Sequence, residues 1–172
     1  MLEVALSVLP ALIVMILAVF FFDRMTSQKR SHYNHLLDVE KVKHVMPLKI
    51  KAYERLIIMI ERIKPYGLVM RNNTGQMTAG QLQLELLRSI REEFEHNISL
   101  QMYISERAWQ AVSIAKEETL QLIKVASSKV QPNVSAMTLS QEIFALEEQV
   151  GRSAIDQALK ILKLEARKEL HA

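Results

Sequence analysis

The stretch that decides the fold is Thr78–Asn97, which reads TAGQLQLELLRSIREEFEHN. Thr78 followed three residues later by Gln81 is the pattern of a capping box, in which each side chain binds the other residue's backbone amide at a helix start. Apolar residues then recur at steps of three and four, as on one face of a helix: Leu82, Leu86, Ile90 and Phe94, with Leu87 and Ile98 beside them. The stretch predicts a long amphipathic helix.

The preceding helix is bounded by two prolines. Pro47 suits the first position of a helix, where its missing amide costs no hydrogen bond. Pro65 ends the helix, because proline disfavours helical geometry in the residue before it. Between them, apolar residues recur mostly at helical spacing: Ile50, Tyr53, Leu56, Ile57, Ile60 and Ile63. The run Tyr66–Gly75 is predicted to be a loop, since it ends on the turn-forming residues Asn72–Gly75.

Further helices are expected toward the C-terminus. Residues 98–104 are either strand-like or a buried connection, and Ser105 is placed to cap the next helix. Gln131–Asn133 breaks that helix at Pro132. A second capping-box pattern opens a short helix that ends at Gly151, and a last helix starts at Ser153. The two residues of that second capping box are Thr138 and Gln141.

Composition favours the same fold class. The 172 residues include only four Gly and four Pro, whereas all-β folds need many turns. The chain has no Cys, which excludes disulfides, Cys-ligated zinc or iron–sulfur centres and thiol catalysis. We therefore predict an all-α protein whose residues 47–172 form a cytoplasmic helical bundle of four to five helices.

The N-terminal part carries a different signal. Residues Val4–Phe22, VALSVLPALIVMILAVFFF, are 19 in number and interrupted only by Ser7 and Pro10. About 20 apolar residues are needed for a helix to cross a bilayer, so residues 1–24 are predicted to be a transmembrane anchor. A cleaved signal peptide would need positive charge before the run and small residues after it. A buried core helix would be shorter.

The placement of basic residues predicts the orientation. Arg24, Lys29 and Arg30 follow the apolar run, and no Lys or Arg precedes it. Positive residues stay on the cytoplasmic side, so the N-terminus is expected in the periplasm and the bundle in the cytoplasm. Residues 25–46 are predicted to be a basic juxtamembrane linker or a helix extension. Arg24, Lys29 and Arg30 would contact anionic lipid head groups or form a solvated helix face.

The charge pattern extends beyond these three residues. From Asp23 to Lys64, basic residues outnumber acidic ones ten to five. Aromatic residues are not interleaved with these basic ones, which argues against nucleic-acid binding. We therefore expect this excess of basic residues to lie next to the membrane.

One pair of residues has the spacing of metal ligands. Glu93 and His96 form a Glu-x-x-His element of the kind found in di-iron bundles. Such sites need a second element of this kind, and the sequence contains none. Phosphate-binding glycine loops and nucleophile motifs are missing as well. The chain is predicted not to be an enzyme and to hold no cofactor, with Glu93 and His96 as the weak metal candidates.

A polar and aromatic region offers candidate contacts with a partner protein. It includes Arg88, Arg91, Tyr103 and Trp109, and Arg, Tyr and Trp are enriched in interface hot spots. The alternative is a central helix of the bundle with a solvated charged face.

Several short motifs resemble those of a known family: Lys51–Leu56 (KAYERL), Gln81–Leu87 (QLQLELL), Glu93–Asn97 (EFEHN) and Tyr103–Ser105 (YIS). The chain resembles a family of uncharacterised Bacteroidota proteins with one N-terminal membrane anchor and a helical body. The resemblance implies a bacterial inner membrane and no particular reaction.

Together these features predict a non-enzymatic accessory subunit or adaptor of an integral membrane protein complex in the inner membrane. A second copy of the chain, in a homo-oligomer, is a further candidate partner. The alternative is a metal-binding sensor or enzyme that uses Glu93 and His96. A stalk subunit like the stator of rotary ATPases is a variant of the first hypothesis, although Pro47, Pro65 and Pro132 interrupt the long helix that a stalk requires.

Overall fold

The computed structural model describes residues 15, 17, 20–21, 43–150 and 153–170. The chain divides into two units, Met1–Met46 and Pro47–Ala172. In the first unit, Met15, Leu17, Phe20 and Phe21 are helical and exposed. The rest of the predicted anchor, together with Arg24, Lys29 and Arg30, lies outside the described residues.

Within the part of the chain that the structure describes, no helix is both long enough and apolar enough to cross a bilayer.

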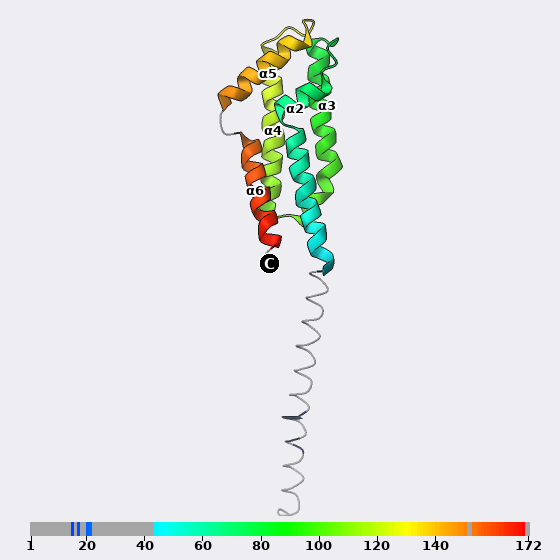
Figure 1. The fold of residues 1–172 in the computed structure, drawn as a ribbon, viewed down its shortest axis with the longest axis vertical. Helices are drawn as coiled ribbons and strands as arrows, with labels where there is room; N and C mark the ends of the chain where they lie inside the picture. Colours follow the sequence, from blue (N-terminus) through cyan, green and yellow to red (C-terminus); the bar gives the residue numbers. More distant parts are fainter. Residues whose placement is uncertain (1–14, 16, 18–19, 22–42, 151–152, 171–172) are drawn as a thin grey trace, which may run out of the picture. The chain divides into compact units, whose positions relative to one another are not determined.

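The second unit is a helical bundle (Figure 1). Residues 47–62 are helical, and six further elements follow: α2 (Pro65–Asn72), α3 (Ala79–Asn97), the short 3-10 helix η1 (Ile98–Tyr103), α4 (Glu106–Ser128), α5 (Ala136–Val150) and α6 (Ala154–Leu170). The described residues contain no strand, only an isolated bridge between Thr78 and Ser135. The prediction of an all-α fold is confirmed, but the described residues of the bundle contain one α-helix more than the four to five predicted.

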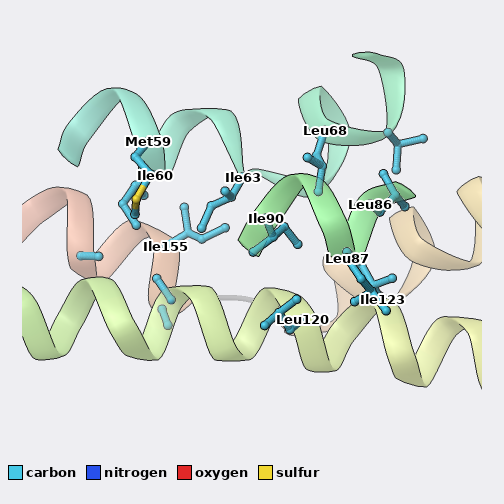
Figure 2. Close-up of a cluster of buried hydrophobic side chains, with 14 of the residues drawn as sticks. Met59, Ile60, Ile63, Leu68, Leu86, Leu87, Ile90, Leu120, Ile123 and Ile155 are labelled. Atoms are coloured by element: carbon cyan, nitrogen blue, oxygen red, sulfur yellow. The ribbon is translucent and has the colours of Figure 1, made fainter. Parts of the chain in front are cut away.

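Helix α4 is the central element of the bundle. It packs against α3, α5 and α6. The residues that it buries include three alanines, which let neighbouring helices approach closely: Ala108, Val112, Ala115, Thr119, Leu120, Ile123 and Ala126. Figure 2 shows Leu120 and Ile123 of α4 on the side of this helix that faces Leu87 and Ile90 of α3, in the same buried cluster as Ile60 and Ile155.

Three predicted helix starts are confirmed. Thr78 and Gln81 form the reciprocal capping box at α3. The Ser105 hydroxyl accepts a hydrogen bond of 3.0 Å from the Ala108 amide at α4. The Ser153 hydroxyl accepts one of 3.3 Å from the Asp156 amide at α6. Local side-chain chemistry is sufficient to specify such starts, because both partners lie within one turn.

Helix α2 corrects the prediction that Tyr66–Gly75 is a loop. Pro65 both ends the preceding helix and occupies the first turn of α2, where proline is well tolerated. Leu68 and Val69 are buried in the core, which compensates for the short length of the helix. The turn after it is as predicted, with Gly75 at a φ of +79°.

Pro47 is likewise not the first residue of its helix, because residues 43–46 are already helical. The fixed φ of proline is compatible with a helix, but inside one proline loses a hydrogen bond and its ring crowds the carbonyl of the preceding turn, so this position carries a cost. The expectation that residues 98–104 are strand-like or a buried connection is wrong on both alternatives: residues 98–103 form η1, a 3-10 helix in which no residue is buried.

Helix α5 begins before the predicted capping box at Thr138 and Gln141. The helix starts at Ala136, and the Ser135 hydroxyl accepts a hydrogen bond of 3.3 Å from the Met137 amide. The Ala136 amide donates to the Met77 carbonyl at 3.0 Å. A contact with a segment far away in the sequence therefore sets this helix start.

The start of α3 and the loop before α5 interlock. The Ala79 amide donates to the Val134 carbonyl at 2.8 Å, and the Gly80 amide donates to the Pro132 carbonyl at 2.9 Å. These bonds satisfy amides of the first helical turn, which have no partner within the helix. A Cβ atom at Gly80 would lie 3.2 Å from the Pro132 Cβ, so Pro132 would have to move by a few tenths of an ångström to accept it.

Two Gly→Ala variants test this interlock. Gly67→Ala in α2 is expected to stabilise the fold by about 0.5–1 kcal/mol, because alanine favours helices and a Cβ there meets nothing within 4 Å. Gly80→Ala is expected to lose that gain through its contact with Pro132. Urea unfolding of both variants measures the difference, and equal stabilisation at the two positions would show that the interlock tolerates a Cβ.

Candidate functional site

The four residues predicted to contact a partner lie in different surroundings. Trp109 is partly buried, and its ring packs against Phe94 with centroids 5.1 Å apart. The Lys116 ammonium lies 4.3 Å from the centroid of the same Phe94 ring. Trp109 therefore helps to join α3 to α4, and much of its surface is used inside the bundle.

The other three residues do not gather around Trp109. Arg88 is exposed on α3 and pairs with Glu85 at 2.5 Å and Glu92 at 3.5 Å. Arg91 is exposed on the same helix. Tyr103 lies in η1, in a hollow shared with α6. The part these residues play in partner binding stays a prediction.

Glu93 and His96 line a surface hollow of about 380 Å³ between α2, α3 and the helix over residues 47–62. Its other lining residues are polar or charged: Arg62, Arg71, Asn72, Ser89 and Glu92. The Arg62 Nε donates to a carboxylate oxygen of Glu93. Arg71 in turn donates to the Arg62 carbonyl at 2.8 Å. Two guanidinium groups therefore lie where the metal hypothesis would place a cation.

Glu92, Glu93 and His96 all line this hollow, yet together they do not form a metal-binding group. Among the described residues, no group of three or more His, Asp and Glu side chains has the geometry to hold a metal ion. The ion pair between Arg62 and Glu93 offers a different role for Glu93, that of joining α3 to the first helix of the bundle.

Elemental analysis of protein purified without chelator tests the metal hypothesis. We expect less than one metal ion per chain, because Arg62 competes for the Glu93 carboxylate. His96→Ala is expected to leave the metal content unchanged. Stoichiometric metal that is lost in His96→Ala would instead establish Glu93 and His96 as ligands.

A second cluster joins three helices at the end of the bundle where residue 47 lies. Glu165 of α6 accepts hydrogen bonds from the Tyr53 hydroxyl at 3.0 Å and the Ser105 hydroxyl at 2.7 Å. One turn further along α6, Glu169 pairs with Lys49 at 3.1 Å. We call these five residues the polar clamp: Lys49, Tyr53, Ser105, Glu165 and Glu169.

The polar clamp is partly withdrawn from water. The pKa of the Tyr53 hydroxyl is raised from 10.0 to about 12, chiefly by burial and then by its hydrogen bond to the Glu165 carboxylate. Ser105 has two functions, since its hydroxyl also caps α4. The clamp therefore holds the first helix of the bundle against both α4 and α6.

Sequence reasoning missed this cluster, although a signal for it exists. Lys49 and Tyr53 are four residues apart, and so are Glu165 and Glu169. Two helices that pack antiparallel bring such pairs into register. The pattern identifies the pairing only once the two helices are known to be neighbours, because more than 110 residues separate them.

Comparison with known proteins adds a family and no activity. A family of unknown function, DUF7935, matches residues 1–169. The chain belongs to the DUF7935 family. No curated protein and no solved structure matches it. The resemblance to an uncharacterised family is confirmed, and the DUF7935 match covers both the N-terminal apolar run and the helical bundle.

Tyr53→Phe tests the polar clamp. Since the folded-state pKa is raised, the protonated hydroxyl favours the folded state below pH 10, and this contribution is lost as the pH rises through about 12. We expect the variant to lose about 1 kcal/mol of stability at neutral pH, from one hydrogen bond. It should also lack the tyrosine that titrates near pH 12 in NMR spectra of labelled tyrosine.

Tyr66→Phe is the matched control, because Tyr66 is 63% exposed and lies outside the clamp. That variant should keep the titration near pH 12. Loss of this signal in Tyr66→Phe, or its survival in Tyr53→Phe, would contradict the assignment to Tyr53.

Proposed function

We propose that this DUF7935 protein is a non-enzymatic accessory subunit or adaptor, which holds a helical docking module beside an integral membrane protein complex. The N-terminal residues 4–22 serve as the tether in the bacterial inner membrane, with the N-terminus in the periplasm and the bundle in the cytoplasm. Arg24, Lys29 and Arg30 contact anionic lipid head groups on the cytoplasmic side.

The observation that carries this proposal is the polar clamp. The helix over residues 47–62 is the element that connects the bundle to the N-terminal unit along the chain. The clamp fastens the beginning of this helix to α4 and α6 through Tyr53 and Lys49. A subunit whose function is to hold position needs the helix next to its tether to be firmly attached to the docking module.

The packing of the bundle supports the same role. Among the described residues, every buried side-chain nitrogen or oxygen has a hydrogen-bond partner. A cluster of apolar residues from the helix over residues 47–62, α2, α3, α4, α5 and α6 forms one continuous core. Such a core gives a stable scaffold with side chains held in one arrangement, as a docking surface requires.

Membrane attachment is tested in the full-length chain. Arginine at Leu12 and Ile16 places two charges in the apolar run, and each costs about 2.5–3.5 kcal/mol at the centre of a bilayer. We expect the Leu12→Arg, Ile16→Arg variant to leave the carbonate-washed membrane fraction. The conservative variant Leu12→Ile, Ile16→Leu should stay in it. An arginine variant that stays in the membrane would rule out this tether.

Orientation is tested by cysteine labelling, which the cysteine-free sequence makes simple. A membrane-impermeant maleimide should label Leu2→Cys in intact spheroplasts. It should label Gln121→Cys, at an exposed position on α4, only after lysis. The reverse labelling pattern would place the bundle in the periplasm and contradict the proposal.

A further inference from the structure

A groove runs along the outer side of α6, next to the end of the first helix of the bundle. We call it the α6 groove. It has a volume of about 430 Å³ and is lined by charged and apolar side chains from both elements: Glu61, Lys64, Asp156, Leu159, Lys160, Lys163, Leu164 and Arg167.

The acidic groups of the α6 groove already have partners. Glu61 pairs with Lys64 at 2.6 Å. The Asp156 carboxylate accepts a hydrogen bond from the Ser153 hydroxyl at 3.3 Å, as part of the cap of α6. The cations Lys160, Lys163 and Arg167 differ from them. Among the described residues, no carboxylate oxygen lies within 4.0 Å of any of these three. The groove therefore has an excess of positive charge.

The three cations form one line along α6. Their spacing of three and four residues places them on a single helix face, over about 10 Å of axial rise. Leu164 lies in the same groove and is 48% exposed, whereas Leu159 is almost buried. The groove thus combines a row of positive charge with apolar surface beside it.

We propose that the α6 groove binds an acidic amphipathic helix of a partner protein. This inference rests on the proposed function and names the class of partner for the docking module. An amphipathic helix that lies in a groove between two helices presents anchors at steps of three and four residues. Acidic residues at that spacing would pair with Lys160, Lys163 and Arg167, and apolar residues beside them would cover Leu164.

The charge pattern of the groove favours a helix over a lipid surface. The carboxylates of Glu61 and Asp156 line the same hollow as the three cations. An anionic bilayer presents negative charge to the whole surface and would meet these carboxylates as well as the cations, whereas a partner helix can place its acidic residues opposite Lys160, Lys163 and Arg167 alone.

Photo-crosslinking in the native host tests the proposal with the full chain. Benzoylphenylalanine replaces Leu164 in the groove or, as the control, Gln121 on α4. We expect a crosslink from position 164 to a segment of another membrane-complex protein, with acidic residues at helical spacing. Crosslinks to lipid only, to a second copy of this chain, to a segment without acidic residues, or no crosslink would overturn the proposal.

Charge reversal provides the second measurement. Lys160→Glu, Lys163→Glu, Arg167→Glu should reduce the crosslink yield about tenfold or more, because all three proposed charge pairs become repulsions. A control with the same change in net charge is Lys51→Glu, Arg107→Glu, Lys124→Glu, at exposed positions outside the groove. It should retain the yield within about twofold. Equal loss in both variants would show a general charge effect and contradict the assignment.

Different results would contradict the groove assignment and the proposed function. Circular dichroism and thermal unfolding confirm that each triple variant is folded. If the chain stays in the membrane and co-purifies with its complex while position 164 gives no crosslink to an acidic helix, only the groove assignment is wrong. If the wild-type chain neither enters the membrane nor co-purifies with a complex, the proposed function is wrong.

Discussion

The bundle depends on the close packing of α4 against three neighbouring helices. Alanine occupies three of the positions that α4 buries, Ala108, Ala115 and Ala126, and all three are fully buried. Small side chains at these points allow neighbouring helices to approach, while Val112 and Ile123 fill the space between them. Larger residues at the alanine positions would force the helices apart, because a packed core has no free volume to accept them.

Polar contacts at the two ends of the bundle hold this core in register. At one end, the backbone bonds between Ala79 and Val134 and between Gly80 and Pro132 join the start of α3 to the loop before α5. At the other end, the Glu165 carboxylate accepts hydrogen bonds from the hydroxyls of Tyr53 and Ser105. Apolar packing is nondirectional, whereas hydrogen bonds have defined distances and angles, so these two contact regions select one arrangement of the helices.

The same contacts bear on function. The polar clamp includes Lys49, close in sequence to the N-terminal unit, and Glu169 of α6. The α6 groove lies on this same helix α6. A helix that forms a docking surface must stay in place when a partner binds. DUF7935 membership covers both the apolar run and this bundle, which fits a protein whose two parts work together in the proposed adaptor.

Much of the fold could be predicted from the sequence alone. The capping residues Thr78, Ser105 and Ser153 act within one helical turn, and the spacing of apolar residues shows which helix face is buried, so helices α3, α4 and α6 were predicted correctly. Only the tertiary structure decided the rest. The existence of α2, the start of α5 at Ala136 and the pairings of Glu93 with Arg62 and Glu165 with Tyr53 all depend on groups distant in the sequence. A local sequence pattern indicates whether a segment forms a helix and which face of it is buried. It does not specify which distant side chain that helix contacts after packing.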